Sequence, residues 1–465
     1  MRILVIGLDC GAPELVFGNG RLENLRRLMD RGCYGRLESV IPPITVPAWM
    51  CMATSRDPGS LGVYGFRNRT SFAYDGLGVV NSRSISAPAI WDCLDQPGKQ
   101  AVIVGVPPSY PPRKVNGVSI GCFLTPDPAR SEFTHPAGLK TVLHDLVGDY
   151  PVDVTGFRTD DKQWLRTAIV DMTKKHFTVI RHLLKEIDWH YFQFVEIGLD
   201  RIQHGFWKFH DRQHRQYVAG NPFESVVLDY YKYLDDEIGT LFEFITDDDI
   251  VLVASDHGAQ RLDGGFCVNE WLCREGLLTL HERPDRPTPF KPSQVDWTRT
   301  RVWSEGGYYA RVFVNVEGRE PAGIVPANQY EALLGDLQAR FEALLDDRGA
   351  PMRSQVFRPD AIYRRVLGIP PDLIVQFGRL TWRSIGGVGY SELHVQENDT
   401  GPDDCNHAQF GMFILRAPGL PIRGEVQDMH LLDVAPTLLD LAGRDVPPSM
   451  QGQSLLRSAA CQVAR

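Results

Sequence analysis

The sequence predicts an α/β fold in which a mostly parallel central sheet is covered by helices on both faces. Two observations favour this class. Apolar runs typical of buried strands alternate with longer segments whose apolar residues recur at helical spacing. Three of these runs, residues 2–8, 191–197 and 250–254, are followed closely by acidic and histidine side chains. Because ligands gather at the carboxyl ends of strands in an open α/β sheet, these side chains are expected to meet there.

The first half of the chain contains two units in which a long helix leads into one of these strands. Apolar residues recur at helical spacing over residues 164–184 and 226–244, just before the second and third strands. A proline-rich stretch over residues 107–136 is expected to run irregularly over the strand ends, because proline cannot continue a regular element. Further elements are expected as helices at residues 22–29 and 90–94 and as a strand at residues 100–105.

Beyond Gly258 the pattern changes, because residues 282–301 are rich in Pro, Arg and Asp and are typical of a surface linker. Residues 382–402 are rich in glycine and are expected to form loops. The remaining elements are expected as strands at residues 312–316, 373–377 and 410–415 and as helices at residues 329–345 and 431–441. We therefore expect a single α/β domain spanning residues 1–465, with cap or specificity insertions around residues 60–165 and 276–400.

The composition is that of an ordinary globular protein, with 43% apolar and 23% charged residues over 465 positions. No apolar run is long enough to cross a membrane, and residues 1–9 lack the pattern of a secretory signal, so we expect a cytoplasmic protein. The nine cysteines include no C-x-x-C pair, which favours reduced thiols. A net charge of −9 argues against binding duplex nucleic acid. The oligomeric state is left open.

Five acidic and histidine residues follow the three predicted strands. Asp9 ends the first strand, and Asp256 and His257 come directly after the third. Asp200 and His204 are four residues apart, so a helix would place both on one face, where they can bind one metal ion. Each of these residues also has a structural interpretation, since an aspartate can cap a helix and a histidine can pack in the core.

Two further candidates lie outside the predicted strands. His407 is uninformative alone, because the chain has thirteen histidines. Thr45 lies between Pro43 and Pro47, just before residues 48–54, which can form a helix with Pro47 in its first turn. A hydroxyl at this position is near free backbone N–H groups and the positive end of the helix dipole, which favour a phosphate oxygen. Its alternative role is that of an N-cap.

Taken together and in this order, these motifs resemble the type I phosphodiesterase/nucleotide pyrophosphatase branch of the alkaline phosphatase superfamily. The resemblance covers nearly the whole chain. It is carried by Ile-Gly-Leu-Asp at residues 6–9, Pro-Pro-Ile-Thr-Val-Pro-Ala-Trp at 42–49, Leu-Asp-Arg-Ile-Gln-His at 199–204, Ala-Ser-Asp-His-Gly at 254–258, Asn-His at 406–407 and the segment 433–443. It implies an alkaline phosphatase-like core in which Asp9, Thr45, Asp256 and His257 hold one metal ion. It also implies that Asp200, His204 and His407 hold a second.

The sequence departs from the family pattern after the Thr45 segment. The family often has Pro-Gly-x-His-Gly there, whereas this chain reads Pro-Gly-Ser-Leu-Gly at residues 58–62. The nucleotide pyrophosphatases also place an asparagine nearby to hold a phosphate oxygen, and the candidate here is displaced to Asn68. This departure weakens any specific assignment to nucleotide substrates.

The resemblance implies a metal-dependent phosphoric ester hydrolase acting on a small-molecule phosphoester. Mixed carboxylate and imidazole ligands suit two Zn²⁺ ions, with Mn²⁺ or Fe as alternatives because no thiolate is expected in the site. On the two-metal template, the Thr45 hydroxyl is activated to attack phosphorus and gives a phosphothreonine intermediate, which water then hydrolyses.

Diesters or nucleotide-type esters are expected to be preferred over monoesters, because no arginine convincingly adjoins the motifs to meet the extra charge of a monoester. Arg67, Arg69 and Arg201 are candidates for binding a phosphate through two parallel hydrogen bonds, although a solvated surface charge is the simpler role for each. The aromatic residues at 206–209 and the stretch 107–136 are candidates for covering a second ester arm, although core packing is the simpler role for the aromatic residues.

Other interpretations stay open at this point. A phosphomonoesterase or a phosphoglycerate mutase-like phosphotransferase of the same superfamily shares the two-metal core, but the mutases usually have a serine nucleophile and a large separate domain, neither of which the sequence indicates. A sulfatase needs a C-x-P-x-R context, which residues 51–55 do not supply. A non-catalytic binding protein that retains the fold is the alternative of a different class.

Overall fold

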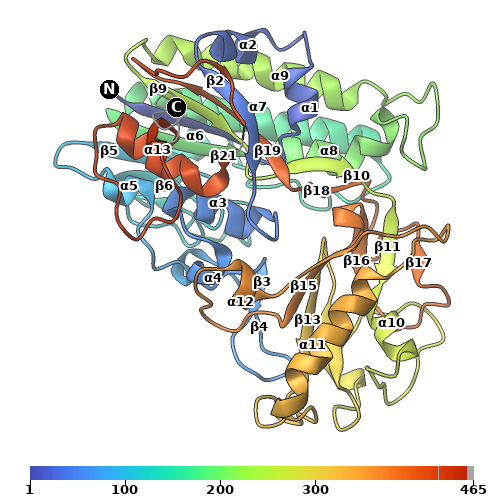
Figure 1. The fold of residues 1–465 in the computed structure, drawn as a ribbon. Helices are drawn as coiled ribbons and strands as arrows, with labels where there is room; N and C mark the ends of the chain where they lie inside the picture. The colour runs from blue at the N-terminus through green and yellow to red at the C-terminus, as the bar shows by residue number, and fades with distance from the viewer. Residues whose placement is uncertain (428, 458–465) are drawn as a thin grey trace, which may run out of the picture.

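The computed structural model describes residues 1–427 and 429–457, and it contains a large lobe next to a smaller one (Figure 1). The large lobe is built around a ten-stranded sheet with the strand order β20-β2-β19-β9-β1-β8-β5-β6-β7, and β21 pairs with β2 beside this path. The strands are β1 (Ile3–Leu8), β2 (Cys33–Glu38), β5 (Gln100–Val104), β6 (Gly117–Ile120), β7 (Thr134–His135), β8 (Trp189–Glu196), β9 (Ile250–Ala254), β19 (Phe410–Arg416), β20 (Gly424–Glu425) and β21 (Met429–His430).

The centre of this sheet is parallel, as the sequence predicts. β1 pairs in parallel with β8 and β9, and β5 pairs in parallel with β8 and β6. The strand β19 lies in the sheet as expected from its apolar run, but it is antiparallel to both β9 and β2. The carboxyl ends of β1, β8 and β9 therefore lie at one edge of the sheet, which is where the candidate ligands begin.

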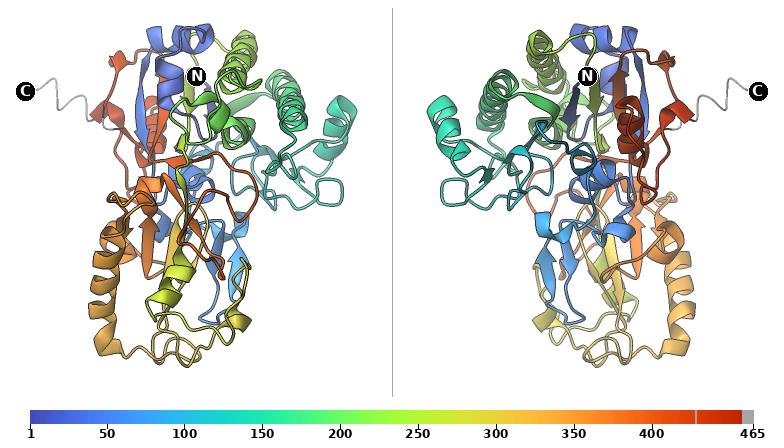
Figure 2. Two further views of the ribbon diagram at one scale, coloured as in Figure 1. Left: turned by 90° about the vertical axis from the view of Figure 1, so that its right-hand side faces the viewer. Right: turned by 90° about the vertical axis from the view of Figure 1, so that its left-hand side faces the viewer.

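Helices cover both faces of the central sheet (Figure 2), which confirms the predicted fold class. The side chains of β1 alternate between two cores, since Ile3 and Val5 face one and Leu4 and Ile6 face the other. The first core is covered by α3 (Thr45–Thr54), α5 (Ile90–Cys93) and α13 (Val434–Leu441). The second is covered by α2 (Glu23–Asp30), α6 (Leu139–Val147), α7 (Lys162–Glu186), α8 (Gly198–His210) and α9 (Val226–Thr240).

The smaller lobe has an apolar core of its own and consists of short sheets packed with helices. One sheet has the order β12-β13-β15-β14 and the other the order β16-β11-β17. Their elements are β11 (Gly264–Cys267), α10 (Val268–Arg274), β12 (Val302–Glu305), β13 (Ala310–Val314), α11 (Ala327–Glu342), β14 (Gln355–Phe357), β15 (Leu373–Gln376), β16 (Trp382–Ile385) and β17 (His394–Val395). This lobe coincides largely with the insertion expected at residues 276–400.

Two expectations about irregular segments are corrected. Residues 107–136 contain β6 and β7, which extend the edge of the central sheet, so this stretch is only partly an excursion. Residues 382–402 contain the short strands β16 and β17, which both pair with β11. These strands are too short to give a recognisable strand pattern in the sequence. Within the insertion expected at 60–165, the hairpin of β3 (Arg67–Arg69) and β4 (Leu77–Val79) extends to the smaller lobe, where Tyr74 stacks on Trp297.

A two-stranded ribbon connects the loops at the sheet edge with the smaller lobe. It consists of β10 (Gly258–Arg261) and β18 (Cys405–Ala408), which pair in antiparallel register with Ala259 opposite His407. Because β10 follows Asp256 and His257 directly, this pairing places His407 beside them. Within the described residues, no helix is both long and apolar enough to cross a membrane.

Candidate metal centre

The seven predicted ligands converge at the carboxyl edge of the central sheet. Asp9 follows β1, and Asp256 and His257 follow β9. Asp200 and His204 lie on one face of α8, which starts two residues after the end of β8. Thr45 is the first residue of α3. All of these side chains and that of His407 are buried. The sequence prediction that residues remote in the chain meet at this edge therefore agrees with the geometry.

A first cluster consists of Asp9, Asp256 and His257, with Thr45 beside it. The ligand atoms of these three residues all lie within 4.8 Å of one another. His257 Nε2 is 3.2 Å from Asp256 Oδ2 and 3.8 Å from Asp9 Oδ1. Thr45 Oγ1 lies 3.2 Å from His257 Nε2 and 3.4 Å from Asp9 Oδ1. The hydroxyl thus faces the same point as the three ligand atoms.

A second cluster consists of Asp200, His204 and His407. Asp200 Oδ1 is 3.2 Å from His204 Nε2 and 3.9 Å from His407 Nε2. The two clusters are adjacent, because the rings of His257 and His407 stack with their centroids 3.8 Å apart, and Asp200, His257 and His407 also have ligand atoms within 4.8 Å of one another. The arrangement therefore offers two neighbouring positions for cations.

The buried side chains have unused hydrogen-bonding capacity and closely spaced carboxylates, both of which a divalent metal ion would satisfy. Asp200 Oδ1, His204 Nε2 and Asp256 Oδ2 are buried without a hydrogen-bond partner, which is costly unless another group binds them. Burial and the charge of Asp200 raise the pKa of Asp9 well above its usual range, because the buried carboxylates repel one another. Burial lowers the pKa of His257 to about 4, so its ring is neutral at pH 7, as a metal ligand must be.

A thiol also lies beside the second cluster, although no thiolate was expected in the site. The ligand atoms of Cys10, Asp200 and His204 lie within 4.8 Å of one another. The Cys10 thiol donates a hydrogen bond to the carbonyl of Gly258 at 3.4 Å, and burial raises its pKa well above the usual value. This proximity could not be read from the sequence, because Cys10 simply follows Asp9 in the chain.

Asp403 orients the second cluster, and the sequence reasoning missed it. Its Oδ1 accepts a hydrogen bond from His204 Nδ1 at 2.6 Å, which leaves Nε2 of that ring facing Asp200. Its Oδ2 accepts from Arg158 at 3.1 Å and from Arg383 at 3.0 Å. Although burial alone would raise the pKa of Asp403, its contacts with His204 and the two arginines lower it well below the usual range. The only signal in the sequence was an acidic pair four residues before His407.

Replacing Asp403 with asparagine is expected to weaken metal binding by about 10- to 100-fold, the usual cost of losing the group that orients a ligand histidine. Titration of the metal-free protein with Zn²⁺ measures this directly. The matched control is Asp404→Asn, because the neighbouring buried carboxylate of Asp404 contacts Lys208 at 3.2 Å, and only the backbone N–H of Asp404, which the substitution keeps, contacts His204. Equal zinc affinity in the Asp403→Asn variant and the control would contradict the orienting role.

Two other contacts orient predicted ligands through the atom that does not face the cluster. Trp49 donates a hydrogen bond from Nε1 to Asp9 Oδ2 at 2.8 Å, which leaves Oδ1 directed to Thr45. His407 Nδ1 lies 2.9 Å from the carbonyl of Pro43, so its Nε2 is the nitrogen that faces Asp200. Both partners lie within or directly before α3, so the helix that begins with Thr45 also positions ligands of both clusters.

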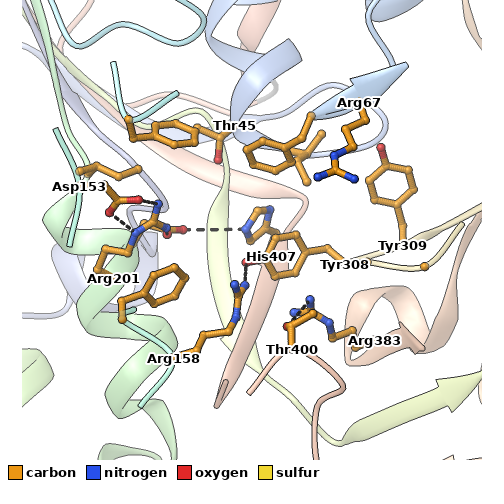
Figure 3. Close-up of a pocket in the computed structure, with 18 of the residues that line it drawn as sticks. Thr45, Arg67, Asp153, Arg158, Arg201, Tyr308, Tyr309, Arg383, Thr400 and His407 are labelled. Carbon is orange, nitrogen blue, oxygen red and sulfur yellow. Dashed lines mark hydrogen bonds and ion pairs between the residues drawn. The ribbon is translucent and has the colours of Figure 1, made fainter. Parts of the chain in front are cut away.

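The centre opens into a cavity of about 520 Å³ lined by residues of both lobes (Figure 3). Thr45 and His407 form part of its wall, with Arg201 and Asp153 on one side of them and Arg67 and Tyr309 on the other. The cavity is also lined by aromatic and aliphatic side chains: Ile44, Phe66, Phe123, Phe157, Ile197 and Tyr308. This volume is in the range of pockets that bind small organic ligands.

The arginines require a correction of the sequence analysis. Arg201 is buried, and its guanidinium pairs with Asp153 at 2.7 and 2.8 Å and with Asp200. Arg67 is exposed, as expected of a surface charge, but it also lines the cavity. Arg69 lies outside the cavity, buried in an ion pair with Glu320 at 3.0 Å. The expectation that no arginine adjoins the centre is therefore wrong.

The predicted substrate contacts also differ from what the structure shows. Asn68 uses both ends of its amide within its own turn, since Oδ1 accepts from the backbone N–H of Tyr64 at 3.0 Å and Nδ2 donates to the carbonyl of Gly62 at 2.8 Å. It does not line the cavity. Phe206 and Phe209 pack on Phe223 in the core of the large lobe, so they do not cover a substrate arm. The cavity aromatics come from separate loops, which gave no pattern in the sequence.

Comparison with known proteins supports the interpretation of these motifs. The family described as "Type I phosphodiesterase / nucleotide pyrophosphatase" matches residues 3–403. None of the curated proteins matches the chain. Among solved structures, the murine ectonucleotide pyrophosphatase/phosphodiesterase 5 is 12% identical with a TM-score of 0.55, and 98% of each chain is covered. Phosphonoacetate hydrolase from Sinorhizobium meliloti, in complex with phosphonoformate, is 15% identical with a TM-score of 0.59 and 94% of each chain covered. At these identities the two structures establish a shared fold.

Proposed function

The chain belongs to the type I phosphodiesterase/nucleotide pyrophosphatase family of metal-dependent phosphoester hydrolases, and from that premise we propose that it is a two-metal phosphodiesterase with Thr45 as its nucleophile. One observation carries the proposal. The Thr45 hydroxyl lies within 3.4 Å of ligand atoms of the first cluster, and the second cluster adjoins it across the stacked rings of His257 and His407.

The proposed ligands follow from the two clusters. Asp9, Thr45, Asp256 and His257 would hold one divalent ion, and Asp200, His204 and His407 would hold the other. Carboxylate and imidazole donors favour Zn²⁺, with Mn²⁺ or Fe as alternatives. When bound, such ions act as Lewis acids that lower the pKa of a nearby hydroxyl and withdraw charge from phosphoryl oxygens. A cytoplasmic location remains part of this proposal.

The chain's own residues then determine the order of bond changes. Thr45 Oγ1 gives its proton to solvent and attacks phosphorus, the P–O bond to the leaving arm breaks, and the retained arm stays on a phosphothreonine at residue 45. Water next attacks the same phosphorus, the bond from phosphorus to Thr45 Oγ1 breaks, and the threonine oxygen takes up a proton from the attacking water. The start of α3 would assist, because Thr45 and Val46 carry first-turn N–H groups with no acceptor within the helix, and such groups stabilise negative charge that develops beside them.

A preference for diesters over monoesters is also part of the proposal, and it now rests on the size of the cavity and on the ion pairs of Arg201. The cavity of about 520 Å³ has room for a second ester arm, and its aromatic lining suits an organic group. Arg201, the buried arginine nearest the second cluster, is already paired with Asp153 and Asp200. It is therefore not free to meet the additional charge of a monoester.

We expect kcat/KM for bis-p-nitrophenyl phosphate to exceed that for p-nitrophenyl phosphate by about tenfold or more, which corresponds to about 1.4 kcal/mol in transition-state binding. The comparison uses the metal-loaded enzyme and measures release of p-nitrophenolate from both esters. A tenfold preference in the opposite direction would assign the chain to the monoesterases of the superfamily instead.

A further inference from the structure

Two arginines in the cavity have no acidic partner among the described residues. Arg67 comes from β3 and Arg311 from β13, and both line the cavity that Thr45 opens into. Neither makes an ion pair with an aspartate or glutamate within 4.0 Å over residues 1–427 and 429–457. Arg67 is exposed, while Arg311 is partly buried. The cavity beside Thr45 is therefore lined by two guanidinium groups that form no ion pair within the described residues.

The other three arginines of the cavity each form an ion pair with a carboxylate, unlike Arg67 and Arg311. Arg201 is paired with Asp153 and Asp200. Arg158 and Arg383 share Asp403, and their remaining contacts are with Tyr308 and Thr400. These three side chains therefore support the metal centre, whereas Arg67 and Arg311 are the cavity arginines that form no ion pair with a carboxylate within the described residues.

Glu305 is the one carboxylate near this pair, and it does not neutralise it. It lies directly opposite Arg311 in the β12–β13 register and lines the same cavity, yet it forms no ion pair within 4.0 Å. Burial raises the pKa of Glu305, while the charges of Arg311 and Arg67 act in the opposite direction. The local sum of charges is therefore positive even when Glu305 is ionised.

The two arginines are held in a fixed relation by the backbone. Arg311 donates a hydrogen bond from Nη1 to the carbonyl of Arg67, and this contact joins β13 to the hairpin that begins with β3. Tyr309, two residues before Arg311, donates a hydrogen bond to the carbonyl of Tyr64. In Figure 3, Arg67 and Tyr309 lie on the opposite side of His407 from Arg201. The pair thus forms part of a second wall of the cavity, across from the Arg201–Asp153 pair.

We propose that Arg67 and Arg311 form an anion subsite, so that the natural substrate is a phosphodiester whose second arm carries a carboxylate or another phosphate group. The inference rests on the proposed function and specifies its substrate class. A guanidinium pair matches the planar oxygens of a carboxylate or phosphate, and such charge-assisted hydrogen bonds are stronger than neutral ones. A simple dialkyl ester would leave both charges without a partner.

The first test measures binding, which does not depend on turnover or on which arm leaves. Calorimetry with the metal-loaded Thr45→Ala protein compares three esters of p-nitrophenyl phosphate that bear a 2-carboxyethyl, a 2-carbamoylethyl or a 2-phosphonooxyethyl arm. The first two have the same shape and differ by one charge. We expect the carboxylate ester to bind about tenfold more tightly or better than the carbamoyl ester. The third ester shows whether carboxylate or phosphate is the better ligand.

The variants then assign the preference to the two arginines. In the Thr45→Ala background, Arg67→Gln and Arg311→Gln are each expected to reduce the preference for the anionic arm severalfold, and the double variant to abolish it. Arg348→Gln is the control, because Arg348 is an exposed arginine outside the cavity. The subsite would be overturned if the carboxylate and carbamoyl esters bound with equal affinity. It would also be overturned if the preference for the carboxylate ester survived both in the folded Arg67→Gln single variant and in the double variant.

Turnover of the carbamoyl ester by the enzyme with Thr45 intact separates this inference from the proposed function. Hydrolysis of that ester, without any preference for an anionic arm in binding, would leave a phosphodiesterase and remove the subsite. Tight, arginine-dependent binding of anionic esters without hydrolysis of any ester would retain the subsite and remove the proposed reaction.

Discussion

Replacing Thr45 with alanine is expected to reduce kcat by about a thousandfold or more while leaving the fold and most of the metal affinity in place. The change removes the attacking oxygen but only one of the four groups proposed for the first ion, and the loss of a nucleophile typically costs at least this much. Steady-state hydrolysis of bis-p-nitrophenyl phosphate by metal-loaded protein measures the effect. Thr45→Ser keeps the hydroxyl and should retain part of the activity.

Thr54→Ala is the matched control for this experiment. Thr54 is the last residue of the same helix, is equally buried, and donates its hydroxyl to the carbonyl of Met50 at 2.6 Å, far from the ligand atoms. It should lose some stability and little activity. Turnover by Thr45→Ala at a rate close to that of Thr54→Ala would show that water attacks phosphorus directly, without a covalent intermediate.

Removing the metal with a chelator is expected to abolish activity and to lower the unfolding temperature of the protein. The activity falls because the Thr45 hydroxyl loses the cation that makes it a nucleophile at neutral pH. The stability falls because Asp9, Asp200 and Asp256 are buried together, and the repulsion between them is no longer offset. For ions present at about a thousand times their Kd, the loss is about 4 kcal/mol per site.

Activity assays and thermal unfolding curves before and after chelation check both parts. The chelator saturated beforehand with Zn²⁺ is the control, because it has the same chemistry but removes no metal. Restoration of activity by Zn²⁺, Mn²⁺ or Fe²⁺, each added alone, then identifies the ion that the centre uses. Full activity and an unchanged unfolding temperature after chelation would show that neither catalysis nor stability depends on a bound metal ion.

The sequence predicted the central sheet and the convergence of the ligands for a common physical reason. Buried parallel strands are continuous apolar runs, as over residues 250–254, and the topology places the residues that come after each strand at one edge of the sheet. The family resemblance, confirmed by the match over residues 3–403, then assigned roles to Thr45 and His407, which the sequence had offered as candidates. His407 reaches the site only through the β10–β18 ribbon, which the sequence did not indicate.

The rest of the site depends on contacts between distant segments that leave no local pattern. Asp403 has a defined role only because His204, Arg158 and Arg383 meet it from three other elements or loops. Contacts between distant segments also decide whether an arginine is ion-paired. Arg201, for example, pairs with Asp153, which lies in a loop 48 residues earlier in the chain. Asn68 was misassigned because its position after the Thr45 segment suggested the family's phosphate contact, whereas its amide is used within its own turn.

Counting the metal ions bound to the purified protein tests the central claim most directly. Elemental analysis of the protein, after equilibration with Zn²⁺ and removal of the excess, should give two equivalents per chain, with one retained when Asp200 and His204 are both replaced by alanine. The two clusters share no ligand in the proposed assignment, so losing one should spare the other. A protein that binds no zinc, or a double variant that still binds two equivalents, would contradict the two-metal centre.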